Sequence, residues 1–211
     1  MTGVKANMAG HIDYFYTSTS PFTWLGHDPF VAMAKKHKKE IVYKPVNLME
    51  VWKVSGGVAP PQRPPMRQRY RLLEMQRLGL YRGLTVIPQP DSFPANPERA
   101  DCCCIVLARE GKDPGPFLFS VGEALWSQDR QIADESILAE LLDKAGFDGA
   151  AVVQDSKDES VIEERSANSQ TATELDVIGA PSYVYKGECF WGQDRIDHLG
   201  HMIETDREPI T

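Results

Sequence analysis

HIDYFYTSTSPFTW, residues 11–24, is the stretch that decides the fold. Its first seven residues are mostly aromatic or β-branched and run into Ser, Thr and Pro, which is typical of a buried strand followed by a turn. From Pro21, apolar side chains recur at helical spacing as far as the basic run 35–39, with Pro29 as a point of disturbance. Residues 41–46 indicate a second strand, so the chain opens with a strand–helix–strand unit.

The middle of the sequence is predicted to be helical. Helices are indicated at 66–78, closed by Gly79, at 96–109, at 117–126, at 137–145 and at 159–175. Two short strands follow at 182–185 and 188–191, and a last helix covers 193–203. Parallel strands need a crossover helix and the last two strands need only a turn. This order therefore predicts an α/β fold, with one mixed four-stranded sheet interrupted by an all-helical insertion.

Composition narrows the function classes. The formal charge of −7 disfavours nucleic-acid binding, which depends on neutralising phosphates with Lys and Arg. No apolar segment approaches the roughly 20 residues of a membrane span, and residues 1–10 lack the apolar core of a secretory signal. Three of the four cysteines are adjacent at 102–104, which offers no disulfide framework. We therefore expect a cytoplasmic protein that binds neither nucleic acid nor membrane.

Ser20 stands where a strand gives way to a helix. Free backbone N–H groups and the positive end of the helix dipole stabilise an anion there, and a hydroxyl can donate a hydrogen bond to a thiolate. Pro21 suits the first turn of the helix. A plain helix cap is the simpler interpretation of Ser20, so the local sequence leaves both readings open.

Two later segments carry similar ambiguity. Pro181 lies between a helix and a strand, where a cis bond would expose the preceding backbone groups, although most X-Pro bonds are trans. Gln193 and Asp194 open the last helix, where Asp194 can be a cap or can receive a ligand ammonium group.

Together these segments carry a family resemblance. The signatures are Ser20-Pro21-Phe22-Thr23-Trp24-Leu25, Phe93-Pro94-Ala95-Asn96, Gly179-Ala180-Pro181 and Phe190-Trp191-Gly192-Gln193-Asp194-Arg195. From about Ile12 to Ile203, the chain resembles the 2-hydroxychromene-2-carboxylate isomerases and kappa-class glutathione transferases, the DsbA-like thioredoxin folds with a helical insertion. The resemblance implies a discontinuous thioredoxin-like domain, 11–60 and 158–205, around an insertion, 61–157.

The resemblance also implies a glutathione site. Ser20 would hold the glutathione sulfur as the catalytic residue, Pro181 would be a cis-proline, and Ala180 would pair with the backbone of the tripeptide's cysteine. Gln193 and Asp194 would bind the γ-glutamyl end. Redox relatives carry Cys-x-x-Cys where this chain has Ser20-Pro21-Phe22-Thr23, so disulfide exchange is disfavoured.

The activity implied is isomerisation of an unsaturated aromatic 2-oxo acid, with glutathione as cofactor and a homodimer as the assembly. A kappa-like transferase or peroxidase and a non-catalytic binding module are the alternatives. One departure weakens the substrate assignment: the family often has an asparagine after strand two, where this chain has Gly57-Val58-Ala59, and Asn47 lies too early to replace it.

Other features receive weaker interpretations. Phe22 and Trp24 are candidate walls for an aromatic substrate. Arg67 and Arg71, one helical turn apart, could clamp its carboxylate, or could simply form a solvated face with Glu74. Consecutive cysteines on a helix point in different directions and favour burial over metal binding, and His198 with His201 and Asp194 lacks a further ligand motif. No metal is expected.

Overall fold

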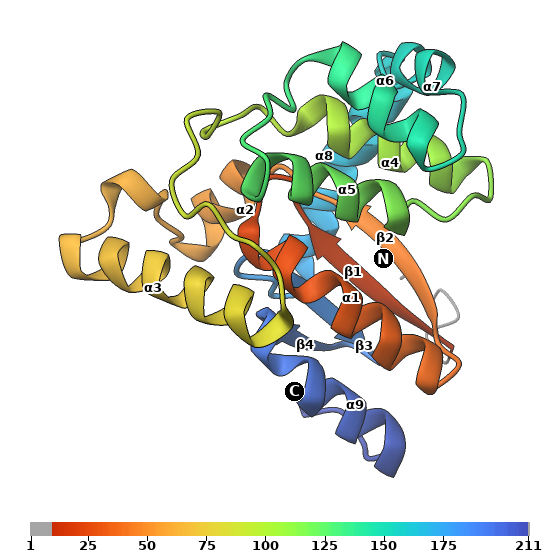
Figure 1. The fold of residues 1–211 in the computed structure, drawn as a ribbon. Coiled ribbons are helices and arrows are strands. Elements are labelled where there is room, and N and C mark those ends of the chain that lie inside the picture. The colour runs from red at the N-terminus through yellow and green to blue at the C-terminus, as the bar shows by residue number, and fades with distance from the viewer. Residues whose placement is uncertain (1–9, 211) are drawn as a thin grey trace.

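A computed structural model describes residues 10–210, so the expectation about a secretory signal, residues 1–10, lies almost wholly outside the described residues. The sheet comprises β1 (His11–Tyr16), β2 (Glu40–Pro45), β3 (Ser182–Tyr185) and β4 (Glu188–Trp191), in the order β2-β1-β3-β4. β1 runs parallel to β2 and antiparallel to β3, and β3 runs antiparallel to β4. The predicted mixed four-stranded sheet is confirmed (Figure 1).

Nine α-helices accompany the sheet in residues 10–210. They are α1 (Pro21–Lys36), α2 (Leu48–Ser55), α3 (Pro65–Arg82), α4 (Glu98–Arg109), α5 (Gly115–Trp126), α6 (Glu135–Lys144), α7 (Gly149–Asp155), α8 (Glu159–Glu174) and α9 (Ile196–Thr205). Short 3₁₀ turns lie at Pro60–Gln62 and Gln193–Arg195. The sequence missed α2 and α7, which are only eight and seven residues long, too short for an apolar period to stand out.

The predicted end of α3 at Gly79 is wrong. The helix continues to Arg82 and ends at Gly83, whose φ of +67° is the left-handed conformation of a helix C-cap. Gly79 serves packing instead: a Cβ there would lie 2.5 Å from the Val86 side chain and 2.9 Å from the Leu84 carbonyl oxygen. A glycine inside a helix can thus signal a close approach as well as an end.

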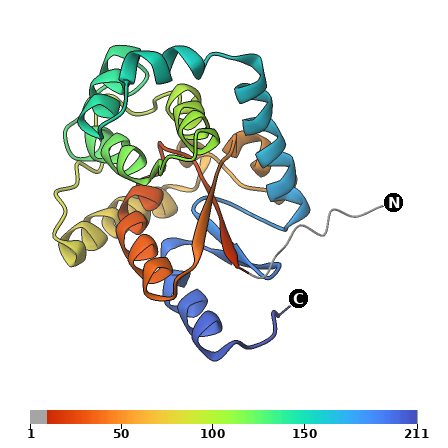
Figure 2. The same cartoon turned by 90° about the vertical axis from the view of Figure 1, so that its right-hand side faces the viewer.

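The two faces of the sheet are covered by different helices. Tyr14, Tyr16 and Tyr183 lie in the larger core cluster with residues of α1, α9 and the inserted helices. Phe15 and Val184 face the other way and pack with residues of α2 and α8. Figure 2 shows the strands edge-on, with α1 on one side and α8 on the other. The alternation of side chains along β1 produces these two faces.

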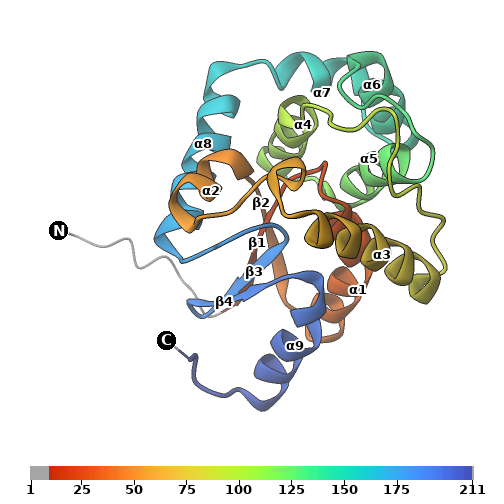
Figure 3. The ribbon, with the colours of Figure 1, turned by 90° about the vertical axis from the view of Figure 1, so that its left-hand side faces the viewer.

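The inserted helices share their core with the sheet. The larger cluster runs without a break from β1 through α4 and α5 to α6 and α7. Figure 3 shows α4, α5, α6 and α7 gathered above the sheet, with α3 beside α1. The domain division at 60/61 and 157/158 stays a prediction. No helix in the described part of the chain combines the length and apolar character that a membrane span requires.

Candidate active site

The sheet register brings three distant segments to one end of the molecule. Phe15 pairs with Ser182, so the residues that follow β1 lie beside those that precede β3. Ser182 also pairs with Trp191, and the Gly192 N–H donates to the Pro181 carbonyl at 2.9 Å. The turn before α1, the Ala180-Pro181 segment and the start of the last helical segment therefore share one edge, as the predicted site requires.

Ser20 is the N-cap of α1 and is 8% exposed. Its Oγ accepts a hydrogen bond from the Thr23 N–H at 3.2 Å, and its own N–H donates to the Thr17 carbonyl at 3.0 Å. The cap interpretation is therefore confirmed. Because the Oγ serves the helix as an acceptor, its proton remains available for donation to an anion. Capping and anion binding are thus compatible roles.

The Ala180–Pro181 bond is cis. Pro181 is buried and Ala180 is half-buried at the mouth of the turn. The Ser182 hydroxyl donates to the Gly179 carbonyl at 2.7 Å, and a Cβ on Gly179 would lie 2.6 Å from the Trp191 indole nitrogen. The turn is consequently held closely from both sides. Phe93–Pro94, another signature segment, is also cis.

Gln193 and Asp194 differ in their surroundings. Gln193 is buried against Gly26 of α1, where a Cβ would lie 2.6 Å from the Gln193 Cβ. Its side-chain oxygen accepts a hydrogen bond from the Arg82 Nη2. The Asp194 carboxylate is exposed and lies 3.1 Å from Arg195 Nη1. The expected helix from 193 begins with a 3₁₀ turn, and α9 itself starts at Ile196.

Arg82 is a site residue that the sequence analysis missed. It is half-buried, and its Nε and Nη1 atoms have no hydrogen-bond partner among residues 10–210. Burial lowers the pKa of its guanidinium, against the nearby Tyr183. Two unpartnered donors next to Gln193 suit a carboxylate ligand. Arg82 was missed because the sequence predicted that α3 ends at Gly79, which left Arg82 outside the helix.

Phe22 and Trp24 both lie in the first turn of α1 but differ in burial. Phe22 is half-buried and packs against the edge of the core, which leaves part of its ring free. Trp24 is 2% exposed and lies against α5, where a Cβ on Gly122 would come within 2.6 Å of its Cγ. Trp24 therefore joins α1 to α5, and its contact with a substrate stays a prediction.

The two arginines of the predicted pair, Arg67 and Arg71, differ in burial. Arg67 is exposed. Arg71 is half-buried, with its guanidinium carbon 5.7 Å from the centroid of Phe93 and 5.5 Å from that of Trp126. Burial lowers the pKa of Arg71 to about 10, and the neighbouring Arg63 lowers it further. No carboxylate lies within 4.0 Å of Arg71 among the described residues. Arg71 is thus the stronger candidate for a substrate carboxylate.

Asp101 of α4 anchors the loop that carries Ser20. This carboxylate is fully buried and accepts hydrogen bonds from the Ser18 N–H at 2.8 Å and the Thr17 hydroxyl at 3.4 Å. Arg165 of α8 completes the cluster, 2.9 Å from Asp101 Oδ2. The same guanidinium donates to the Val46 carbonyl at the end of β2. The inserted helix α4 thereby fixes the turn of the thioredoxin-like part.

A family model decides the classification. The model of the DSBA-like thioredoxin domain matches residues 11–204. The chain belongs to the DSBA-like thioredoxin domain family. The four-stranded sheet with its inserted helices is the fold of this family.

Relatives within this family carry two kinds of name. A 2-hydroxychromene-2-carboxylate isomerase of Sphingobium xenophagum is 25% identical over 194 residues, which cover 91% of this chain and 97% of that protein. Glutathione S-transferase kappa 1 of Caenorhabditis elegans is 23% identical over 205 residues, covering 92% and 90%. A solved structure of 2-hydroxychromene-2-carboxylate isomerase matches with a TM-score of 0.78 at 22% identity, covering 92% and 94%. The structural likeness confirms the DsbA-like fold.

The loop after β2 of this DSBA-like chain differs from the expected pattern. Asn47 is the N-cap of α2: its Oδ1 accepts from the Met49 N–H at 3.2 Å and its Nδ2 donates to Glu50 at 2.9 Å. Its amide is therefore occupied. Gly57 packs under Trp52, and the Arg63 Nε donates to the Val58 carbonyl at 2.7 Å. An arginine thus lies beside the segment where the family often has asparagine.

The four cysteines of this DSBA-like protein lie in α4 and β4, outside the segment that carries Ser20. Cys102, Cys103 and Cys104 are buried, and Cys189 is half-buried in β4. Burial raises the pKa of the Cys102 thiol to about 11 and that of Cys103 to about 12. Within residues 10–210, no three His, Cys, Asp or Glu side chains gather closely enough to hold a metal ion.

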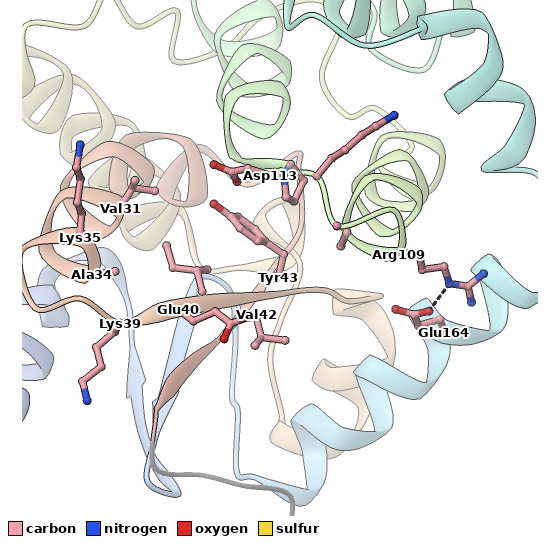
Figure 4. A pocket seen from close by; sticks show the side chains of 15 residues that line it. Val31, Ala34, Lys35, Lys39, Glu40, Val42, Tyr43, Arg109, Asp113 and Glu164 are labelled. Atoms are coloured by element: carbon pink, nitrogen blue, oxygen red, sulfur yellow. Dashed lines mark hydrogen bonds and ion pairs between the residues drawn. The ribbon is translucent and has the colours of Figure 1, made fainter.

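A groove of about 670 Å³ lies elsewhere in the molecule, along the free edge of β2. Figure 4 shows it between α1, β2 and the segment that joins α4 to α5, with Tyr43 and Asp113 at its inner end. Arg109 pairs with Glu164 across its rim at 2.7 Å. None of the predicted site residues lines this groove. The groove and the candidate site are therefore different places on the molecule.

Proposed function

We propose that this chain is a glutathione-dependent isomerase of an unsaturated aromatic 2-oxo acid, related in activity to 2-hydroxychromene-2-carboxylate isomerase. The observation that carries the proposal is the meeting of Ser20, cis-Pro181 and Gln193 at one end of the sheet. Isomerase names recur among the relatives that span nearly the whole chain. The absence of cysteine from residues 17–24 further favours an external thiol over an internal disulfide.

The site fits glutathione on the evidence of its own unpaired groups. Two Arg82 donors without partners lie next to Gln193, where they suit the α-carboxylate of a γ-glutamyl group. Asp194 is exposed nearby and suits the ammonium of the same group. Ala180 offers its backbone groups beside cis-Pro181, where an extended peptide can pair as a further strand. The thiol would then lie towards Ser20.

Bound glutathione would supply a thiolate for reversible addition to the conjugated double bond, which would become a rotatable single bond until elimination restored it in the other geometry without net thiol consumption. Ser20 and the free N–H groups of α1 stabilise the thiolate and thereby lower its pKa. Phe22 offers part of its ring to the substrate. Arg71, held over Phe93 and Trp126, binds the substrate carboxylate.

A kappa-like glutathione transferase is the second candidate, because a relative of that name covers 92% of the chain. The same thiolate would then attack an electrophile and leave with the product. Consumption of thiol separates the two reactions. An isomerase interconverts 2-hydroxychromene-2-carboxylate and its trans open-chain isomer at constant thiol concentration, whereas a transferase loses one thiol per turnover.

The test is calorimetric titration with glutathione followed by the isomerase assay, with Ser20→Ala as the informative variant. We expect the parent to bind glutathione and Ser20→Ala to lose at least tenfold in kcat, since each unit of thiol pKa is tenfold in thiolate near neutral pH. Asp134→Ala is the matched control. Asp134 caps α6 by accepting a hydrogen bond from the Ser136 N–H, so this variant also removes a helix cap, but from a helix that carries none of the predicted site residues.

Each result points to one class of protein. Equal activity in Ser20→Ala and the parent would contradict the role of Ser20. A parent that binds no glutathione at millimolar concentration would sink the proposal and favour a non-catalytic binding module. Location in the cytoplasm stays a prediction.

A further inference from the structure

The arginines between residues 63 and 82 differ from the other arginines that the structure describes. Elsewhere in residues 10–210, every arginine has a carboxylate within 4.0 Å. Inside the segment, Arg77 pairs with Glu74 at 3.4 Å. The remaining five have no carboxylate within 4.0 Å among the described residues: Arg63, Arg67, Arg69, Arg71 and Arg82. Since the chain has 30 Asp and Glu against 23 Lys and Arg, a shortage of carboxylates does not explain this.

Arg63 and Arg71 lie close together and partly out of water. Both residues are half-buried. Burial lowers the pKa of both guanidiniums, and the positive charge of Arg63 lowers the pKa of Arg71 further. Two cations that share a poorly hydrated place repel each other, and each also loses hydration energy. A bound anion would offset both costs, which arginines on a solvated helix face do not incur.

Contacts with the protein fix the direction of the Arg63 guanidinium. Its Nε donates to the Val58 carbonyl at 2.7 Å, and its central carbon lies 5.7 Å from the centroid of Trp52. These contacts occupy Nε and one face of the group, and they leave both Nη groups for a ligand. A planar fork of this kind matches a carboxylate. Because the side chain is already held, less entropy is lost when it binds.

The pair lies at the end of the candidate site away from Gln193. Arg71 and Arg82 are eleven residues apart on α3, which is three helical turns, so they share one face and lie about 16 Å apart along the axis. Arg82 bonds to Gln193, where the γ-glutamyl group of glutathione is expected. Figure 3 shows α3 alongside α1. Arg63 and Arg71 therefore suit the substrate end of the site.

The segment that holds Arg63 is also where the chain departs from its family. The family often has an asparagine after β2, where this chain has Gly57-Val58-Ala59, and Arg63 is tied to the carbonyl of Val58. A neutral amide and a guanidinium favour different ligand groups, because only the guanidinium carries a charge that a carboxylate neutralises. The departure therefore favours a more anionic substrate.

We propose that the substrate of this chain carries two carboxylates. Arg71 binds the carboxylate of the 2-oxo acid, and Arg63 binds a second carboxylate on the aromatic part. The inference rests on the proposed isomerase function and narrows its substrate class, since 2-hydroxychromene-2-carboxylate has a single carboxylate. The glycine carboxylate of glutathione is another source of the same chemistry, and the experiment separates the two sources.

Calorimetric titration with benzoate and with the three benzenedicarboxylates, at saturating glutathione, tests the class of substrate. We expect at least one dicarboxylate to bind the parent at least tenfold more tightly than benzoate does. Arg63→Gln should reduce that preference to less than threefold, because it removes the charge that the second carboxylate meets. Arg69→Gln removes an exposed arginine of α3 and, as the control, should keep the preference. Circular dichroism checks that both variants are folded.

The outcomes assign the second anion. No preference for a dicarboxylate in the parent, or an equal preference in the parent and Arg63→Gln, would overturn the proposal. A tenfold loss of glutathione affinity in Arg63→Gln with an unchanged dicarboxylate preference would assign Arg63 to the glycine carboxylate and would overturn it too. Because glutathione binding by the parent is measured first, failure of the glutathione proposal is seen separately from failure of this one.

Discussion

At the scale of single residues, Arg82 stands out in the candidate site because two of its donor nitrogens have no hydrogen-bond partner among the described residues. Two of its nitrogens are buried without partners among the described residues, and the third bonds to Gln193. Arg82→Met keeps most of the apolar stem and removes all three donor nitrogens. We expect the dissociation constant of glutathione to rise at least tenfold in calorimetric titration, which corresponds to about 1.4 kcal/mol.

The control for Arg82 is Arg69→Gln, which removes an exposed arginine from the same helix. It should leave glutathione affinity within twofold of the parent. If Arg82→Met bound glutathione as well as Arg69→Gln does, Gln193 would have to recognise the γ-glutamyl end without help from α3.

His27 makes folding sensitive to pH. It is buried among Tyr14, Tyr43 and Phe119, and burial lowers its pKa from 6.5 to about 4, against the opposing effect of Asp113. The unfolded chain therefore binds a proton that the folded chain excludes between these values. This stabilising contribution is complete above pH 6.5 and is lost as the pH falls towards 4, by about 3 kcal/mol.

His27→Phe should remove this pH dependence. Urea unfolding at pH 7, 6, 5 and 4 should show a shallower decline in the variant than in the parent. His198→Gln removes an exposed imidazole and should follow the parent. Parallel curves for the parent and His27→Phe would show that His27 is protonated in the folded protein.

At the scale of secondary-structure elements, the Asp101–Arg165 pair ties α4 and α8 to the loop before α1. Burial raises the pKa of Asp101, against the lowering effects of Arg165 and the Ser18 hydrogen bonds. Asp101→Asn keeps an acceptor for the Ser18 N–H and leaves the buried Arg165 with only Glu98, 4.0 Å away, as an anionic partner. We expect the free energy of unfolding to fall by about 3–5 kcal/mol, and glutathione affinity to fall with it as the loop loosens.

A second carboxylate provides the comparison for Asp101. Asp129 also holds a loop, by accepting the N–H groups of Asp91 and Ser92, but it is only half-buried and pairs with no buried cation among the described residues. Asp129→Asn should cost far less stability and leave glutathione binding unchanged. The double variant Asp101→Asn/Arg165→Met should recover part of the loss, because it leaves no buried unpaired charge. Equal losses in the two single carboxylate variants would argue against an anchoring role for Asp101.

At the scale of the whole molecule, glutathione should stabilise the fold, since its proposed site draws on β1, α1, α3, β3 and the segment before α9. At a hundredfold excess over the dissociation constant, binding adds about 2.7 kcal/mol. For a chain of this length, that amounts to a rise of roughly 5–10 °C in Tm by differential scanning fluorimetry. S-methylglutathione, which has no ionisable thiol, should give a smaller rise. An unchanged Tm at saturating glutathione would contradict the site.

Much of the fold could be predicted from local patterns. The alternation in β1, the strand–helix–strand opening and the final hairpin specify the mixed sheet. Ser20, Pro181 and Gln193 could be nominated from their motifs, but only the register of β3 against β1 and β4 brings them together. Asp101 and Arg82 could not be assigned, because their roles depend on contacts with residues 83 and 111 positions away in the chain. The packing of Trp24 against α5 could not be predicted either, since an aromatic residue beside a motif does not reveal which element it contacts.

The burial of three of the four cysteines would have a consequence for an enzyme of the proposed activity. A conjugated unsaturated acid is an alkylating agent, and it reacts with any thiolate that it can reach. The side chains of Cys102, Cys103 and Cys104 on α4 are buried. Burial also raises the pKa of the half-buried Cys189 thiol to about 11. Under the proposed function, the reacting thiol would belong to replaceable glutathione while the protein's own thiols stay protonated, so a covalent adduct that failed to break down would be lost with glutathione and not with the enzyme.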